Sequence, residues 1–298
     1  MSDTSKENEE RFEFGKNWNK FIKRNFSQER CDVSKAHILK FIGRDDLKGL
    51  DFLDIGCGSG LHSLAAFQSG AGKIHSLDYD PNSVETTELL HKYAQNPSNW
   101  KIGRGDVLDG DYVDGLGIWN FVYSWGVLHH TGDVWQAIRN AQSRVADGGL
   151  FYIALYAADV QTDMQFWLDV KREYNKSSTL KKKWMALWYV YRFGMDKKIY
   201  KLPLILKQIW QHRFERGMSY FADVHDWLGG WPMEFTYDQD VVDLLEKEHG
   251  FKLINVATGE ACSEFLFERT GSPETPTNVK EMVGRAKKEA ESAKANES

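Results

Sequence analysis

Short apolar runs alternate with amphipathic segments through the first half of the chain. The stretch 51–54 is a short, mostly apolar strand that ends in an acid, three glycines at alternate positions follow it, and a helical pattern covers 61–67. Later apolar runs have strand length, and the segments between them have helical spacing. This alternation predicts an α/β fold with a parallel sheet. Further strands are expected at 73–78, 100–104, 120–124 and 150–155, with helices at 83–93 and 134–144.

Two stretches depart from this alternation. The first carries aromatic residues at helical spacing and then a helix over 33–42 that ends at Gly43. The second is aromatic and basic, and its spacing predicts added helices. A helix over 238–249 and strands over 251–256 and 264–268 then resume the α/β pattern. We therefore expect disordered residues 1–10, an N-terminal helical lid over 11–43, an α/β core over 44–156, a helical substrate cap over 157–235, the end of the core over 236–270, and a mobile tail over 271–298 that buries little.

Composition narrows the class of protein. Of 298 residues, 42% are hydrophobic and 13% aromatic, and the net charge of −5 argues against general nucleic-acid binding while allowing a local basic patch. Cys31, Cys57 and Cys262 are widely spaced and form neither a disulfide framework nor a metal-binding pair. The start of the chain is polar and acidic, unlike a secretory signal, and no apolar run is long enough to span a membrane. These features predict a cytoplasmic enzyme with no membrane partner, and they leave the oligomeric state open, a homodimer included.

The turn after the first strand carries the first candidate chemistry. It reads Asp-Ile-Gly-Cys-Gly-Ser-Gly from Asp54 to Gly60. Glycine lets a ligand approach the main chain, and the helix start beyond it offers unpaired N–H groups. A dinucleotide fingerprint would have its third glycine where Leu61 stands. The acid two residues before the first glycine, with the spacing G-x-G-x-G, resembles instead the first motif of class I methyltransferases that depend on S-adenosylmethionine (SAM).

Later landmarks follow in the order that this resemblance implies. Asp78 ends the second strand 22 residues after Gly56, close to the roughly 20-residue spacing at which a carboxylate holds a ribose. Asp80 precedes a proline and is expected to cap the next helix. Asp106 follows the third strand, where the family contacts the adenine amino group. The resemblance gives Val107 a backbone N–H to the same ring.

The resemblance implies a fold, a cofactor and a set of binding residues. The fold is a doubly wound, seven-stranded, mostly parallel, Rossmann-like sheet that ends in a late helix and an antiparallel strand pair. The cofactor is SAM, with S-adenosyl-L-homocysteine (SAH) as product. In this family an early aromatic segment often folds over the cofactor, although these aromatic residues would also suit packing on the core. The implied cofactor-binding residues are Phe14, Trp18, Asp54, Gly56, Cys57, Gly58, Gly60, Asp78, Tyr79, Asp106, Val107, Ser124 and Trp125.

The end of the fourth strand faces the transferred methyl group in a sheet of this kind. The sequence there, Ser-Trp-Gly-Val-Leu-His-His, lacks the runs typical of DNA-methylating and protein arginine methyltransferases. It resembles the small-molecule group that contains ubiquinone-type O-methyltransferases, in which a Leu-His-His step is frequent. His129 and His130 are candidate catalytic bases, with His225 as a third. They could instead merely line the pocket. Their spacing favours no metal site.

The last part of the cap differs from the helices before it. Residues 219–235 concentrate acids, a histidine, two tryptophans and a Gly-Gly-Trp-Pro turn, which are unfavourable for helix. A similar run occurs, together with an early Phe-Gly-Lys-Asn-Trp segment, in a bacterial subgroup of class I methyltransferases. We expect substrate contacts here, although the same side chains could tie the cap to the sheet. The candidate substrate-binding residues are Trp125, His129, Asp223, His225, Asp226 and Glu234.

The predicted function is SAM-dependent methyl transfer to a small-molecule acceptor by in-line displacement, with O-methylation ahead of N- or S-methylation. One alternative is a methyltransferase acting on tRNA or another RNA through the basic cap, whose RNA affinity would fall steeply with salt. Another is a SAM-binding protein without catalysis. An oxidoreductase that uses NAD is disfavoured by Leu61.

Overall fold

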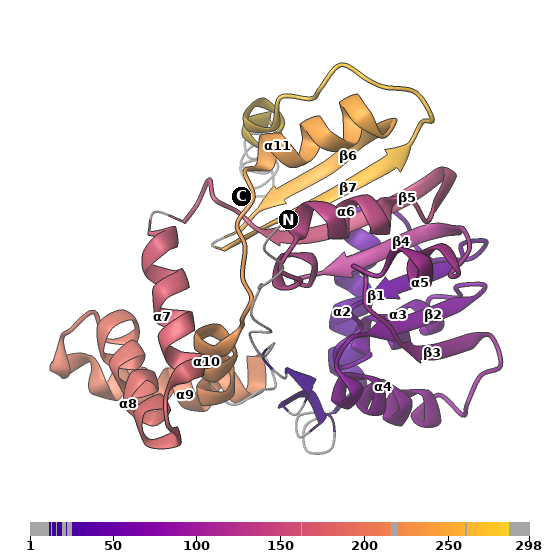
Figure 1. The fold of residues 1–298 in the computed structure, drawn as a ribbon. Coiled ribbons are helices and arrows are strands. Elements are labelled where there is room, and N and C mark those ends of the chain that lie inside the picture. Colours follow the sequence, from indigo (N-terminus) through magenta and orange to yellow (C-terminus); the bar gives the residue numbers. More distant parts are fainter. Residues whose placement is uncertain are drawn as a thin grey trace, which may run out of the picture.

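A seven-stranded sheet forms the centre of the protein in the computed structural model (Figure 1). The strand order is β3-β2-β1-β4-β5-β7-β6, in which the first five strands are parallel and β7 runs antiparallel to both of its neighbours. This arrangement confirms the predicted doubly wound sheet with a final antiparallel pair. The strands are β1 (Phe52–Ile55), β2 (Ile74–Asp78), β3 (Trp100–Arg104), β4 (Trp119–Trp125), β5 (Val145–Tyr156), β6 (Phe251–Thr258) and β7 (Cys262–Arg269).

The structure describes most of the chain between residues 12 and 285. The described residues are 12, 14–15, 17–19, 22, 26–161, 163–215, 220–259 and 261–285, without the side chains of 208, 210–215, 222 and 223. The predictions for residues 1–10, for residues 286–298 and for the side chain of Asp223 therefore lie outside the described residues. Within them, no helix is long and apolar enough to cross a membrane.

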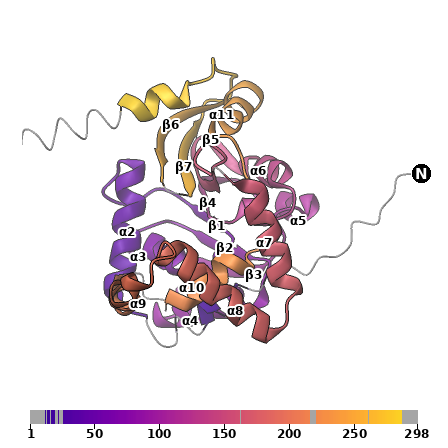
Figure 2. The ribbon, with the colours of Figure 1, turned by 90° about the vertical axis from the view of Figure 1, so that its left-hand side faces the viewer.

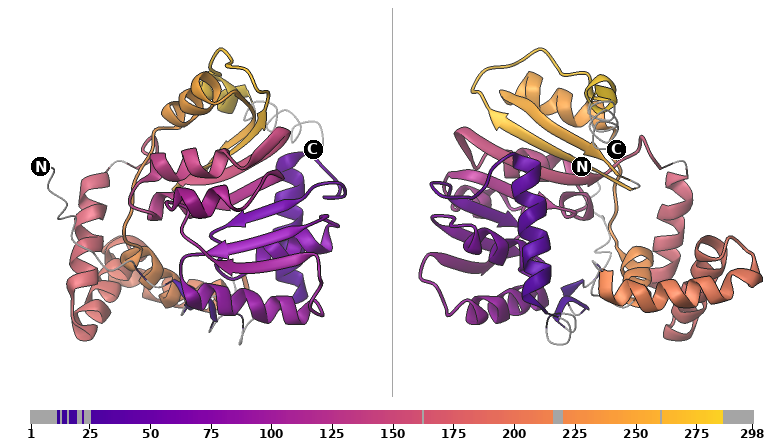
Figure 3. Two further views of the ribbon diagram at one scale, coloured as in Figure 1. Left: turned by 45° about the vertical axis from the view of Figure 1, so that its right-hand side comes forward. Right: turned by 180° about the vertical axis from the view of Figure 1, so that it is seen from behind.

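Helices cover both faces of the sheet because successive strand residues point to opposite sides. Phe121 and Tyr123 of β4 pack in the cluster on one face, whereas Val122 packs in the cluster on the other. Figure 3 shows α2 in front of the sheet when the molecule is seen from behind. The first face carries α2 (Gln28–Ile42), α3 (Leu61–Gln68) and α4 (Pro81–Tyr93), and the second carries α5 (Gly110–Asp114), α6 (Val134–Gln142), α11 (Asp238–Asp243) and the π-helical turn η4 (Leu244–Glu248).

The insertion between β5 and α11 folds as a helical cap with a small apolar core of its own. Figures 1 and 2 show the cap beyond the carboxyl ends of the parallel strands, at one end of the molecule. Ligands bind at this edge in doubly wound sheets, so the cap lies over the expected site. Its elements are α7 (Met164–Lys176), α8 (Thr179–Tyr189), η2 (Val190–Gly194), η3 (Ile199–Lys201), α9 (Leu202–Glu215) and α10 (Tyr220–Gly229).

The expectation that residues 219–235 are unfavourable for helix is wrong for their first part. Residues 220–229 form α10, in which Val224 and Leu228 are buried in the core of the cap. These two apolar residues are four positions apart and face the same side, so packing outweighs the weak helix propensity around them. The helix ends at the glycine pair, where the N–H of Gly230 donates to the carbonyl of Asp226.

The segment after β7 also differs from expectation. The prediction that it buries little surface is wrong for residues 277–283, because Val279 is buried in the same core cluster as α6 and α11. Thr277 is held there by Glu246, whose carboxylate accepts hydrogen bonds from the N–H and the hydroxyl of Thr277. The mobility predicted for 271–298 stays a prediction.

Candidate active site

The glycine turn after β1 is shaped by contacts that exclude side chains. Gly56, Gly58 and Gly60 have φ values of +77°, +54° and +79°, which L side chains rarely adopt. A Cβ added to Gly56 would lie 2.3 Å from Cγ1 of Val127. The turn therefore packs directly against the segment that leads from β4 to His129.

Asp78 is fixed beside this turn at the end of β2. Its Oδ2 accepts a hydrogen bond of 2.9 Å from the N–H of Gly58, and its Oδ1 accepts one of 2.8 Å from the N–H of Asp80. Burial raises the pKa of the carboxyl to about 6. Asp80 caps α4 by accepting from the N–H of Asn82, as predicted, and it also accepts from the N–H of Gly15 in the N-terminal segment.

Asp54 lies in β1, two residues before the first glycine of the turn, and its side chain is inside the protein. It is buried and accepts a hydrogen bond from the hydroxyl of Ser63, whose oxygen is also 2.6 Å from that of Ser76. The carboxylate thus links β1 to α3 and, through Ser63, to β2. Burial, with a smaller effect from the charge of Asp78, raises the pKa of Asp54 to about 7. The structure supplies these internal partners for Asp54, and its predicted contact with the cofactor stays a prediction.

This raised pKa predicts that Asp54→Asn gains stability relative to the wild type as the pH rises. The native state holds a proton that the unfolded chain loses from its ordinary pKa of 3.8 upward, so the wild type loses stability between about pH 4 and about pH 7. Asparagine stays neutral and can still accept from Ser63. The free energy of unfolding of Asp54→Asn minus that of the wild type should rise by about 1 kcal/mol per pH unit. Urea unfolding of both proteins at about pH 5, 6 and 7 measures this difference. A difference that is constant with pH would contradict the buried, protonated state.

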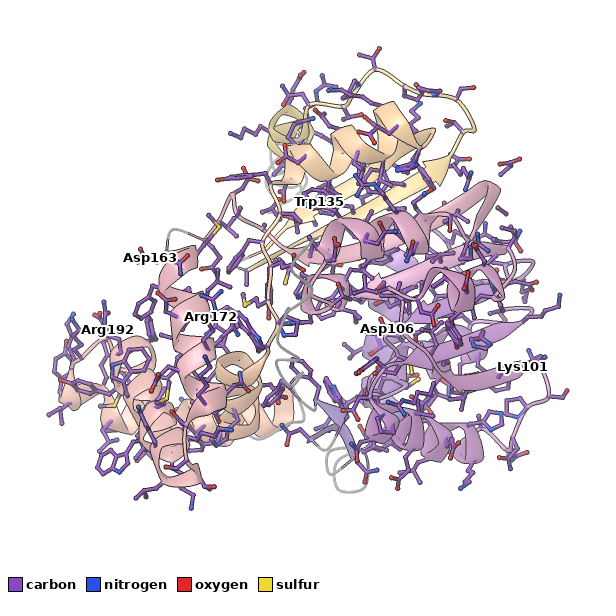
Figure 4. The ribbon with its side chains drawn as sticks, viewed as in Figure 1. Lys101, Asp106, Trp135, Asp163, Arg172 and Arg192 are labelled. Carbon is purple, nitrogen blue, oxygen red and sulfur yellow. The ribbon has the colours of Figure 1, made fainter. Side chains whose placement is uncertain are left out.

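Three further residues predicted to bind the cofactor follow the ends of β2 and β3: Tyr79, and the adenine candidates Asp106 and Val107. Tyr79 is exposed, and the Arg104 guanidinium lies 5.7 Å from the centre of its ring. Asp106 accepts a hydrogen bond from the N–H of Leu108, and Val107 is buried. Figure 4 shows Asp106 on the side of the sheet toward the cap, whereas Lys101 projects from the opposite side. The strand order therefore brings Tyr79, Asp106 and Val107 to the same edge of the sheet as Asp78.

The described residues of the N-terminal segment contact both the glycine turn and the cap, and the predicted lid role of this segment stays a prediction. Trp18 approaches the glycine turn, with its Nε1 3.4 Å from the position of a Cβ on Gly58. The ring centres of Phe14 and His130 are 5.2 Å apart. Asn17 donates a hydrogen bond of 2.6 Å to Asp226 in the cap. The segment thus joins the glycine turn to the cap.

Hydrogen bonds assign different roles to the two adjacent histidines. The N–H of Tyr156 donates to Nδ1 of His129 at 3.3 Å, so the proton of the neutral ring is on Nε2, which is buried without a partner among the described residues. Nδ1 of His130 lies 2.7 Å from the carbonyl of Pro232 and must donate to it, which leaves a lone pair on Nε2. Burial lowers the pKa of His130 to about 3 and that of His129 well below its usual range. His129 is therefore a hydrogen-bond donor and His130 an acceptor.

The other predicted residues have different surroundings. His225 forms a hydrogen bond with the hydroxyl of Tyr174, so its contact lies within the cap. Glu234 accepts from the N–H of Val134 at the start of α6, which ties the cap to the sheet. The N–H of Glu234 also donates to the carbonyl of His129 at 2.9 Å, so Glu234 adjoins the histidine pair through its backbone, whereas His225 contacts Tyr174. At the edge and beside the turn, Trp125 is exposed with its ring centre 6.1 Å from that of His62, Ser124 donates to the carbonyl of Ile55, and buried Cys57 contacts Thr87.

Sequence reasoning missed Tyr156 and Lys171, which border the histidine pair. The ring centre of Tyr156 is 4.1 Å from that of His129 and 5.7 Å from that of Trp227. Lys171 is fully buried, its ammonium 4.5 Å from the centre of the Trp227 ring, and burial lowers its pKa to about 7. Two signals were available: Tyr156 ends a strand at the ligand-binding edge, and Lys171 stands four residues after Trp167 on the inward face of α7.

A family model described as "Methyltransferase domain" matches residues 23–227, which is more than half of the chain. The protein belongs to this methyltransferase family. Its sheet has the class I arrangement, so the predicted family, fold and enzyme class are confirmed. The ubiquinone-type subgroup stays a prediction.

Several similar proteins are methyltransferases as well. The ribosomal protein L11 methyltransferase of Oceanobacillus iheyensis is 29% identical over 87 residues, so the match spans 29% of this chain and only 28% of that relative. The structure of magnesium protoporphyrin IX methyltransferase from Synechocystis PCC 6803 with bound SAH has a TM-score of 0.50 and 14% identity, covering 85% of this chain and 93% of that one. PKMT2 from Rickettsia typhi in complex with AdoHcy has a TM-score of 0.55 and 13% identity, covering 80% and 53%. At these identities the two structures show the fold alone.

SAM is the cofactor of this methyltransferase family, and the residues at the carboxyl edge fit it. The carboxylate of Asp78 stands at the end of β2 beside a turn of positive-φ glycines, where an acceptor for two adjacent ribose hydroxyls is needed. Asp106 supplies a second acceptor at the end of the neighbouring strand. The individual contacts of these residues with SAM stay predictions. Within the described part of the chain, no group of three or more His, Cys, Asp or Glu residues is arranged to hold a metal ion.

Proposed function

We propose that this methyltransferase transfers a methyl group from SAM to a small molecule bound between the carboxyl edge of the sheet and the helical cap. The observation that carries the proposal is the histidine pair at the end of β4, bordered by Tyr156 from β5 and by Phe14 from the N-terminal segment. A buried N–H on His129 and a lone pair on His130 lie side by side there, their ring centres 4.4 Å apart. Such convergent polar groups among aromatic side chains suit a small polar acceptor.

The histidines favour a hydroxyl acceptor. SAM, when bound, supplies an activated methyl group, so the tasks of this chain are to align the acceptor and to exclude water. His129 would donate to a polar atom of the acceptor and hold it in place. His130 would accept the hydroxyl proton at Nε2 as the oxygen bonds to the methyl carbon and becomes strongly acidic, a transfer that a ring of lowered pKa can still make. O-methylation requires this transfer, and methylation of a thioether or tertiary amine does not. The contacts of the N-terminal segment with the glycine turn, through Trp18, and with the cap, through Asn17, would keep this space dry.

The proposal is tested by incubating the protein with methyl-labelled SAM and a cell extract that has been separated by size. Label is expected in the small-molecule fraction. Label found only in protein, or only in material that ribonuclease destroys, would overturn the proposed acceptor class, and the second result would establish the RNA alternative. No labelled product from any fraction would favour a SAM-binding protein without catalysis.

The role of His130 predicts that His130→Gln slows labelling of the small-molecule fraction by about a hundredfold, as expected for loss of a general base. Binding of SAM, measured by calorimetry, should be unchanged. His91→Gln is a matched control because His91 also lies 3.1 Å from a proline carbonyl, that of Pro97, but does so at the end of α4. If both variants label the acceptor at the wild-type rate, the proposed proton transfer is wrong, whereas the proposed acceptor class stands.

A further inference from the structure

One face of the cap helix α8, and of the turn η2 that directly follows it, is apolar and turned away from the protein. Trp184, Leu187 and Trp188 of α8 and Tyr191 of η2 recur at helical spacing and are 67%, 51%, 38% and 42% exposed. The opposite side, with Ala186 of α8 and Val190 of η2, faces the core of the cap. Surface helices of globular proteins normally bury their apolar stripe. Here two apolar faces exist, and the described residues cover only one of them.

The exposed apolar surface continues into the next part of the cap. Ile199, Tyr200 and Leu202, at η3 and the start of α9, are 71%, 74% and 46% exposed. Figure 1 shows α8 at the end of the molecule farthest from the sheet, and Figure 4 places Arg192 at this outer end. An exposed apolar region on this scale marks an interaction surface.

The charge of this region is opposite to that of the rest of the chain. Residues 176–207 contain nine Lys and Arg and one acid, a local net charge of +8. The whole chain has a net charge of −5, so the residues outside this stretch carry −13. Lys181 and Lys183 are exposed in the first turns of α8 and flank the apolar face, Lys181 beside Glu173, whereas Lys182 lies over the ring of Tyr174 on the inner side. A partner for this surface must therefore be anionic and must also accept aliphatic and aromatic side chains.

We propose that the outer face of the cap, made of α8, η2, η3 and the start of α9, docks on an anionic lipid bilayer. A helix with Trp and Leu on one face and lysines beside it lies in the interface of such a membrane, and each lysine adds attraction to anionic lipid. A second copy of this chain would bring a like charge of +8 against the first. RNA would match the charge and the aromatic residues, but the exposed Leu and Ile have no stacking role on it. The proposal departs from the expectation of no membrane partner, which rested only on the absence of a spanning segment.

The test is flotation of the full-length protein with vesicles of phosphatidylcholine alone or of phosphatidylcholine with phosphatidylglycerol. Binding is expected only to the vesicles with phosphatidylglycerol. Changing Lys181 and Lys183 together to glutamine should lower the partition coefficient by about thirtyfold, since each lysine near an anionic surface contributes about 1 kcal/mol. Trp184→Ala combined with Leu187→Ala should lower it at least about tenfold through lost apolar burial.

Matched controls lie away from the cap. Lys101→Gln removes an exposed charge on the opposite side of the molecule (Figure 4), and Ile118→Ala removes an exposed apolar side chain just before β4. Neither should change vesicle binding. Absence of binding to the anionic vesicles would overturn the proposal, as would equal binding by the α8 variants and the controls. Dimers in sedimentation velocity that Trp184→Ala abolishes would show instead that a second copy covers this face, and retention on RNA without vesicle binding would assign it to RNA.

Discussion

Replacing Asp78 by asparagine is expected to weaken the binding of SAM by about a hundredfold. The Asp78 carboxylate holds the N–H groups of Gly58 and Asp80 at the end of β2, and it is the predicted acceptor for the ribose hydroxyls. Asparagine keeps the size of the side chain but replaces one acceptor oxygen by a donor. A hydrogen bond to a charged group contributes about 1.5–3 kcal/mol, so losing one or two of them accounts for this factor. Calorimetry with SAM and with SAH measures the change.

Asp51→Asn is the matched control for this experiment. Asp51 also accepts a backbone hydrogen bond, from the N–H of Lys73 at 2.9 Å, but it precedes β1 and so lies at the opposite edge of the sheet. Its variant should bind SAM as the wild type does. Urea unfolding of both variants shows whether each is folded under the conditions of the titration. A folded Asp78→Asn protein with the affinity of the wild type would refute the assignment of the ribose contact.

The parts of the site that could be predicted from sequence are those that short segments determine on their own. A glycine turn needs its glycines wherever φ is positive, and an acid that follows a parallel strand must stand at the carboxyl edge. Gly56, Asp78 and Asp106 were placed correctly at that edge for this reason. The role of Asp80 as the N-cap residue of α4 was equally local, since it depends on an acid directly before a helix.

The parts that could not be predicted depend on which distant segments meet. Nothing in the Leu-His-His step says that Pro232 contacts one histidine and Tyr156 the other, yet these contacts decide which ring donates and which accepts. Lys171 was missed for a similar reason, because only the packing of α7 against α10 buries it beside Trp227. The helix at 220–229 shows the same limit, since tertiary packing of its apolar residues outweighed their local propensity.

Gly56→Ala is expected to have the second large effect, a loss of SAM affinity of at least about a hundredfold. Alanine at a φ of +77° costs about 1–2 kcal/mol, and the new Cβ would lie 2.3 Å from Cγ1 of Val127, which adds an overpacking cost of about 1–3 kcal/mol. The turn must therefore leave its native conformation or push Val127 away. Val127 leads into the segment that carries His129 and His130, so the same shift should also slow methyl transfer. Calorimetry and the labelling assay measure the two effects.

Two further variants separate backbone strain from the clash. Gly49 has a φ of +79°, and a Cβ there would meet nothing within 4 Å, so Gly49→Ala carries the strain alone and should leave SAM binding unchanged. Val127→Ala removes the two atoms nearest to the added methyl group, although its Cβ remains 2.8 Å away. Combined with Gly56→Ala, it should therefore restore part of the affinity but not all of it. If the double variant binds SAM no better than Gly56→Ala alone, strain rather than the contact with Val127 determines the need for glycine at this position.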